Sequence, residues 1–139
     1  MPNIYAINSA LYTLLNGDEM LTGLCTIYKG AKRPRGEVNP SLTVFVDKIE
    51  PGKGKGLWLC DVTVRAYDDV GANRMPDHET LGIILARVND VMINAQLTIE
   101  GAKALPIIGK ESKGPEWEYL HDHEANQEII YQLILVQFD

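Results

Sequence analysis

The chain has 139 residues, of which 45% are hydrophobic and 23% are charged, and its formal net charge is −6. This size and composition are typical of one globular domain and exclude collagen-like, disordered and membrane-spanning chains. The excess of acidic residues disfavours nonspecific binding to duplex DNA, which depends on neutralising phosphates. We therefore expect residues 1–139 to form a single domain that needs no disulfide or metal to hold its core.

The first segment predicts an amphipathic helix that begins after Asn3 and ends at Gly17. Asn3 can cap the helix, and Gly17 can take the left-handed position that follows a helix end. A short turn and a strand over residues 25–28 come next. Apolar residues recur at helical spacing in the first helix at Ile4, Ile7, Leu11, Leu14 and Leu15.

Residues 29–41, KGAKRPRGEVNPS, contain two prolines and two glycines and lack apolar periodicity, so they predict a loop. Loops of this length in compact domains are usually functional or mobile. We therefore expect this loop to present its basic side chains to a partner. These side chains belong to Lys29, Lys32, Arg33 and Arg35.

A β-hairpin is predicted next, with strands over residues 42–50 and 57–68 joined by a glycine-rich turn at 51–56. The turn carries Lys53 and Lys55 at its tip. The second strand alternates, which is typical of an antiparallel sheet covered on one face only. Its predicted core face carries Trp58, Cys60, Val62, Val64 and Ala66, and its wet face carries Asp61, Thr63 and Arg65.

A second helix is predicted from Pro76 to about Asn94, because apolar residues repeat there at intervals of three and four. We expect Leu81, Ile84, Leu85, Val88 and Val91 to pack on the hairpin. Short strands over 97–99 and 105–108, a polar loop over 109–118 and a strand over 128–138 follow. The expected fold is an α+β domain, in which an antiparallel sheet of four to five strands carries two helices packed on one face.

The sequence shows no assembled catalytic site. Gly52–Gly56 has alternating glycine and lysine, but a strand follows it where a phosphate-binding loop would lead into a helix. Cys25 and Cys60 lie in apolar segments, where a thiol is inert. We therefore predict no enzymatic activity, no catalytic residue and no cofactor.

Two readings remain open for His121 and His123. On a strand they would share a face and could bind one metal ion, with a third ligand such as His78 or Glu79 supplied from elsewhere. In the other reading they belong to a solvated loop, and no metal is bound. A small cytosolic metal-binding protein therefore stays as an alternative class.

Charge is unevenly distributed along the chain. Residues 29–55 carry seven bases and three acids, whereas residues 111–139 carry one base and seven acids. Such patches can steer a protein to a partner or to another copy of itself, or they can simply be solvated surface. In the polar loop, Trp117 is a candidate interface anchor, since tryptophan is enriched in interfaces; its alternative is packing on the sheet.

The order and spacing of the segments carry a resemblance to a known family. ALYTLLNGDEMLTGL runs into TIYKG, and SLTVFVDKI is followed by LWLCDVTVRAYDD, ETLGIILARVNDVM and EIIYQLILVQF. In this layout the chain resembles the tail terminator or tail-completion proteins of long-tailed bacteriophages, including the minor tail protein U type. The resemblance covers essentially the whole chain, and it rests on apolar patterns and not on a catalytic signature.

The resemblance implies a structural virion protein that forms a ring, usually a homo-hexamer. Such a ring ends the tail tube and mediates head–tail joining, so its partners are other copies of itself, the tail tube protein and the head connector or neck protein. DNA passes through as cargo, and no membrane is involved. The location implied is the virion tail or neck. Since Met1–Asn3 does not begin a secretory signal, we expect synthesis in the host bacterial cytoplasm. A head-completion or neck adaptor protein is the alternative role.

Overall fold

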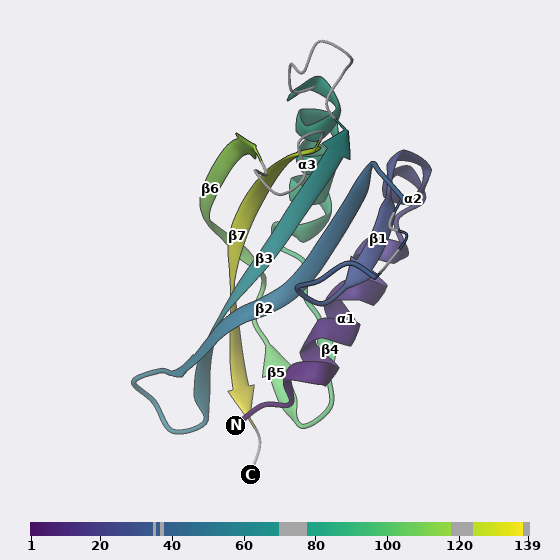
Figure 1. The fold of residues 1–139 in the computed structure, drawn as a ribbon. Helices are drawn as coiled ribbons and strands as arrows, with labels where there is room; N and C mark the ends of the chain where they lie inside the picture. The colour runs from purple at the N-terminus through teal and green to yellow at the C-terminus, as the bar shows by residue number, and fades with distance from the viewer. Residues whose placement is uncertain (35, 37, 70–77, 118–123, 138–139) are drawn as a thin grey trace.

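The computed structural model of the protein describes residues 1–34, 36, 38–69, 78–117 and 124–137 (Figure 1). Its helices are α1 (Ile4–Asn16), α2 (Glu19–Leu24) and α3 (His78–Met92). Its strands are β1 (Thr26–Lys29), β2 (Ser41–Pro51), β3 (Leu57–Asp69), β4 (Thr98–Ile99), β5 (Ala102–Ala104), β6 (Ile108–Trp117) and β7 (Glu124–Gln137). In this described part of the chain, no helix is both long enough and apolar enough to span a membrane.

The strands form one seven-stranded sheet in the order β1-β2-β3-β7-β5-β4, with β6 also paired to β7. β1 and β2 are parallel, and the other pairs are antiparallel. The expected antiparallel sheet of four to five strands with two helices is therefore wrong. The sheet is mixed and larger, and a third helix, α2, forms because Asp18 caps it by accepting a hydrogen bond from the backbone N–H of Leu21.

The parallel pairing of β1 and β2 explains the length of the segment between them. Thr26 pairs with Ser41 and Lys29 pairs with Val44, so both strands run in the same direction. Parallel neighbours need a crossover that returns the chain to its starting level. Residues 30–40 make this return. The length of this segment, which we expected to reflect a function, therefore has a structural reason.

Strand β6 lies where a polar loop was predicted over residues 109–118. The sequence does not indicate a strand here, because low strand propensity and a lack of apolar alternation mark the run Gly109, Lys110, Glu111, Ser112 and Lys113. The strand forms by pairing with one side of β7. The pairing shifts register twice, between Gly109 and Glu111 and between Lys113 and Glu116.

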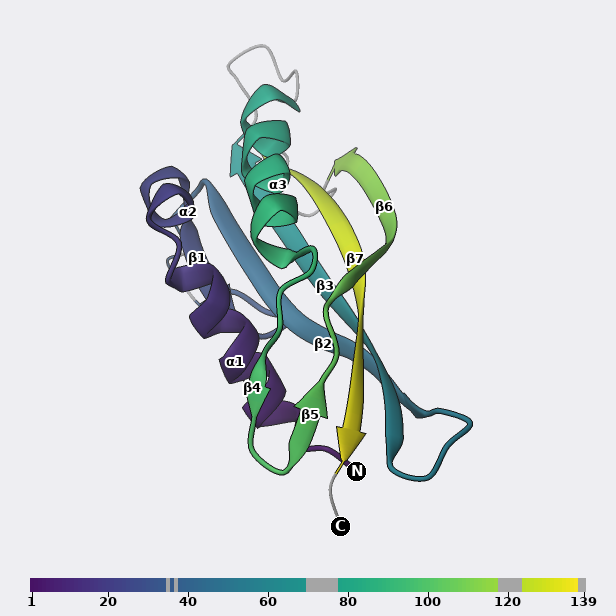
Figure 2. The same ribbon diagram turned by 180° about the vertical axis from the view of Figure 1, so that it is seen from behind.

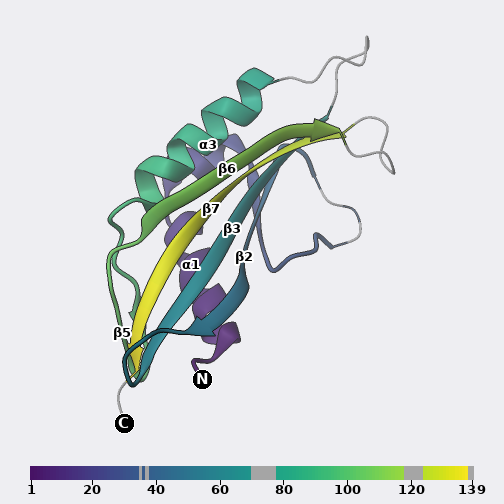
Figure 3. The ribbon, with the colours of Figure 1, turned by 90° about the vertical axis from the view of Figure 1, so that its left-hand side faces the viewer.

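Helices α1 and α3 lie on the same face of the sheet (Figure 2). The sheet is strongly curved, with α3 on one side and the crossover between β1 and β2 on the other (Figure 3). Helix α1 contacts β1 and β2 at one end of the strand order and β4 at the other end. The sheet therefore curls around α1, which brings its two outer strands to the same helix.

The core lies between the helices and the sheet. As the helical spacing predicted, Leu81, Ile84, Leu85 and Val88 of α3 are buried, and Val91 is partly buried. They share the core with Cys60, Val62 and Val64 of β3, and Trp58 lies at its edge. The opposite face of β3 was predicted to be wet, but Thr63 and Tyr67 are buried there. Further core residues are Ile7, Leu11, Leu15, Leu42, Val44, Met92, Tyr131, Leu133 and Leu135.

Candidate interaction surface

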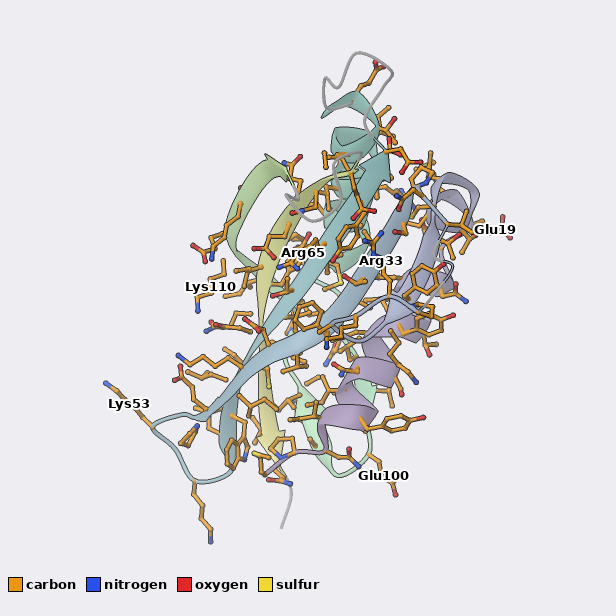
Figure 4. All side chains as sticks on the ribbon, viewed as in Figure 1. Glu19, Arg33, Lys53, Arg65, Glu100 and Lys110 are labelled. Carbon is orange, nitrogen blue, oxygen red and sulfur yellow. The ribbon has the colours of Figure 1, made fainter. Side chains whose placement is uncertain are left out.

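The crossover between β1 and β2 is held to the outer face of the sheet by Arg33. The Nη2 and Nη1 atoms of Arg33 donate to Oε1 and Oε2 of Glu124 at 2.6 and 2.9 Å. The guanidinium also lies 3.6 Å from the centre of the Tyr67 ring. The two side chains of the ion pair are only 10% and 8% exposed. Arg33 is therefore an anchor inside the subunit (Figure 4).

Asn39 and Ser41 complete the polar network around this ion pair. Asn39 Nδ2 donates to Asp69 Oδ1 at 2.8 Å and to Glu124 Oε2 at 2.9 Å. Arg33 Nη1 donates to Asn39 Oδ1 and to Ser41 Oγ. A buried charge is tolerated when it is paired and its remaining hydrogen-bonding sites are satisfied. The network thus ties the crossover to β2, β3 and β7.

The other basic residues of the predicted loop, residues 29–41, do not gather around Arg33. Lys29 extends toward α1, where its Nζ donates to Ser9 Oγ at 3.2 Å and lies 4.5 Å from the centre of the Tyr5 ring. Lys32 is exposed. Arg35 lies outside the described residues. The predicted basic loop therefore contributes Lys29 and Lys32 to the surface and directs Arg33 inward.

The β2–β3 hairpin extends away from the body of the subunit as an arm (Figure 1). A register shift between Val46 and Lys48 begins the arm, and such a bulge bends a strand. At the tip, Gly56 has a φ of 77°, and its carbonyl accepts a hydrogen bond from the backbone N–H of Gln137. Lys53 and Lys55 are both exposed there, and Figure 4 shows Lys53 pointing away from the body.

The remaining predicted sites are placed only in part. The backbone of Trp117 pairs with Ala125 at the end of β6, but its side chain lies outside the described part of the structure. His121 and His123 also lie outside the described residues, as does the side chain of His78. Among the residues that the structure describes, no group of three His, Cys, Asp or Glu side chains could hold a metal ion.

The two cysteines are buried and free. Burial raises the pKa of Cys25 to about 11. Burial, with a smaller contribution from the nearby charge of Asp61, also raises the pKa of Cys60 to about 11. A thiol with a raised pKa is a poor nucleophile at neutral pH. This chemistry agrees with the reading of both residues as structural.

Sequence reasoning missed the residues that organise this surface. Glu124 and Asn39 are 85 residues apart and meet only because β7 lies beside β3. No local pattern marks either residue as the partner of Arg33. The available signal for this contact was the pair of long strands β3 and β7. Their antiparallel pairing places Glu124 opposite Asp69.

Comparison with known proteins shows a likeness in structure and none in sequence. No protein-family model matches the sequence, and no curated protein is similar to it in sequence. The structure is similar to a chain in a solved structure described as "Virion of native gene transfer agent (GTA) particle". The TM-score is 0.72 at 14% sequence identity, and the match covers 94% of this chain and 95% of that chain. At this identity the likeness shows a shared fold.

Proposed function

We propose that the chain is a structural subunit of a phage-like virion. The observation that carries this proposal is the likeness to a chain of a gene transfer agent virion over nearly the full length of both chains. The proposed subunit has no enzymatic activity and acts by assembling with other virion proteins.

Within the virion, the proposed role is that of a tail terminator. In this role, copies of the chain close into a ring, a hexamer in the family that the sequence resembles, at the head-proximal end of the tail tube. The ring stops growth of the tube and contacts the head connector or neck protein, while DNA passes through the ring as cargo. The family resemblance of the sequence supports this role, and the likeness of the fold supports the broader assignment to a virion.

The exposed lysines form the proposed contact surface. Lys32 lies on the crossover, and Lys53 and Lys55 lie on the hairpin arm, all on surface segments outside the core. Lys29 adds a partly engaged ammonium beside α1. Charges at the rim of an interface act chiefly on association rate and salt sensitivity. Arg33 belongs to the folded subunit, and Arg35 and Trp117 remain proposed contact residues.

Mixing experiments with particle parts test the role. The purified protein, labelled with gold, is added separately to headless tails and to tail-less heads of the phage-like particle encoded beside its gene. Electron microscopy should show rings on one end of each tail, and light scattering should show an oligomer in solution. Label on heads alone would support the neck adaptor instead, and label on neither part would contradict a joining role.

A further inference from the structure

A groove of about 530 Å³ lies between α3 and β6. Its floor includes Gln127 and Ile129 of β7, and one wall is formed by Leu85, Ala86 and Asn89 of α3. The opposite wall is the segment of β6 from Gly109 to Ser112. Small residues on both walls leave the groove open along its length.

Gly82 lies on the helix wall of this groove and has no reason for being glycine within the subunit. Its backbone is helical, and a Cβ atom built there would meet nothing within 4 Å. Glycine inside a helix is unfavourable relative to alanine. Beside it, Ile83 is 50% exposed. Both features are explained if another chain packs against α3 at this point.

The outer side of α3 is acidic. Glu79 and Asp90 lie on the exposed side of the helix that carries Gly82 and Ile83. Arg87, the basic residue of this helix, is held by Asp18, with Nη2 donating to Oδ1 at 2.6 Å. On the other wall, Lys110 and Glu111 both line the groove, and each is in an ion pair, with Asp61 at 2.9 Å and with Lys113 at 3.7 Å. An occupant with a basic, narrow surface would complement the acidic outer side of α3 beside the groove.

The tip of the β2–β3 arm has this character. Lys53 is exposed at the tip, and glycines flank it on both sides. Gly52 is needed within the subunit because a Cβ atom there would lie 2.7 Å from the Leu57 side chain. Gly54 has no such constraint, since its nearest neighbour would be 3.9 Å away. The arm tip and α3 thus each keep a glycine that the isolated subunit does not require.

Strand-to-strand joining is a weaker alternative for contact between copies. The free side of β6 is interrupted by the two register shifts, and Lys110 and Lys113 lie along it. Bulges and lysines of this kind protect sheet edges from pairing with another chain. A projecting element of one copy can instead insert into a groove of another.

We propose that the arm tip, residues 52–56, of one copy occupies the α3–β6 groove of the next copy. Lys53 then faces the Glu111 carboxylate of the groove, and the tip packs over Gly82. Two different patches of each subunit meet, so the contact is head-to-tail, as a closed ring requires. The inference deepens the proposed ring and rests on it.

Blocked subunits test the contact. Gly82→Trp fills the groove, and Lys53→Glu reverses the charge of the arm; Gly82→Ala is the matched control, and circular dichroism checks each fold. By native mass spectrometry, wild type and Gly82→Ala should form rings. Gly82→Trp and Lys53→Glu should bind their own copies at least ten-fold more weakly, and adding Glu111→Lys to Lys53→Glu should restore assembly. If Gly82→Trp does not fold, Ile83→Lys places a positive charge beside the groove and should weaken assembly by repelling Lys53.

Mixing the two blocked variants gives the sharpest outcome. The intact arm of Gly82→Trp fits the intact groove of Lys53→Glu, but the pair has no further working contact, so heterodimers should form and grow no larger. Rings formed by Gly82→Trp, or a mixture without heterodimers, would overturn the docking contact and leave the ring itself standing. A wild-type chain that stays monomeric up to its solubility limit would overturn both.

Discussion

Arg33 and Glu124, 91 residues apart in the chain, form a two-armed ion pair beneath the crossover of the sheet. Both side chains are almost completely buried, and the Tyr67 ring covers the guanidinium. The pair therefore joins a basic segment that looks mobile in sequence to the first residue of the central strand β7. Its effect on the stability of the fold can be measured directly.

Removing one partner of this pair should destabilise the subunit strongly. Arg33→Met leaves Glu124 buried without its counter-charge, which typically costs about 3–5 kcal/mol. The loss should appear as a lower urea midpoint with an unchanged slope. The double variant Arg33→Met, Glu124→Leu should recover most of this loss, because no buried charge is left unpaired.

The control for this prediction is the pair Arg65–Glu128 on the same face. Its Nη2–Oε2 distance is 2.7 Å, but Arg65 is 33% exposed. Arg65→Met should therefore cost about 1 kcal/mol or less, as more exposed ion pairs do. Equal losses for Arg33→Met and Arg65→Met would show that burial of the first pair has no special effect on stability.

Stability at acidic pH should depend on Asp18. The hydrogen bond from Arg87 lowers the pKa of Asp18 below its ordinary value. A carboxyl with a lowered folded pKa stabilises the protein above its unfolded pKa of about 3.9, and this contribution is lost as the pH falls through the folded pKa. Asp18→Asn keeps a helix cap but removes the charge. At neutral pH the wild type should have a larger free energy of unfolding than Asp18→Asn. Urea unfolding at a series of pH values should show this difference disappearing below about pH 4. A difference independent of pH would contradict this assignment.

Truncation of two adjacent isoleucines of α3 should change the stability by very different amounts. Ile84 is fully buried, so Ile84→Ala should cost about 2–5 kcal/mol of unfolding free energy. Ile83 is half exposed, so Ile83→Ala should change the stability of the monomer by about 0.5 kcal/mol or less. Thermal melts of both variants measure the difference. Similar melting temperatures would mean that α3 does not pack on the sheet by the face described above.

Neither cysteine should react while the protein is folded. The raised pKa values of Cys25 and Cys60 keep both thiols protonated at mildly alkaline pH, and burial blocks the reagent. Iodoacetamide should label neither residue without urea and both residues in urea, as seen by intact mass. Rapid labelling of the folded protein would show that one of these sites opens.

The sequence predicted the elements that have strong periodicity. Helices α1 and α3 and the β2–β3 hairpin follow apolar patterns of period 3.6 or 2, which burial imposes on one face. The last strand was predicted from a short run of apolar residues at both parities. Strand β6 lacks this pattern because Lys110 and Lys113 lie on a sheet edge, where strand pairing alone holds the backbone. The parallel register of β1 and β2 depends on where residues 30–40 return, and four residues such as Thr26–Lys29 carry no sign of strand direction.

The sequence predicted that the candidate surface is basic, but it did not predict which basic side chains point inward. Counting bases located the two basic segments, but charge alone does not tell an anchor from a contact residue. Arg33 is drawn inward by Glu124, which lies far away in sequence and becomes its neighbour only through sheet topology. Lys53 was predicted in the hairpin turn, and it is exposed in the structure, as expected for a turn.

The central position of β7 has a consequence for how the chain is made. Residues 124–137 form β7, which pairs with β3, β5 and β6. These three pairings can form only after β7 has left the ribosome. Domains generally fold as units during synthesis, and an unpaired strand edge is prone to aggregation in the interval. A nascent chain that stops before Glu124 lacks both the middle of its sheet and the counter-charge of Arg33. Incomplete chains should therefore be prone to aggregation and degradation.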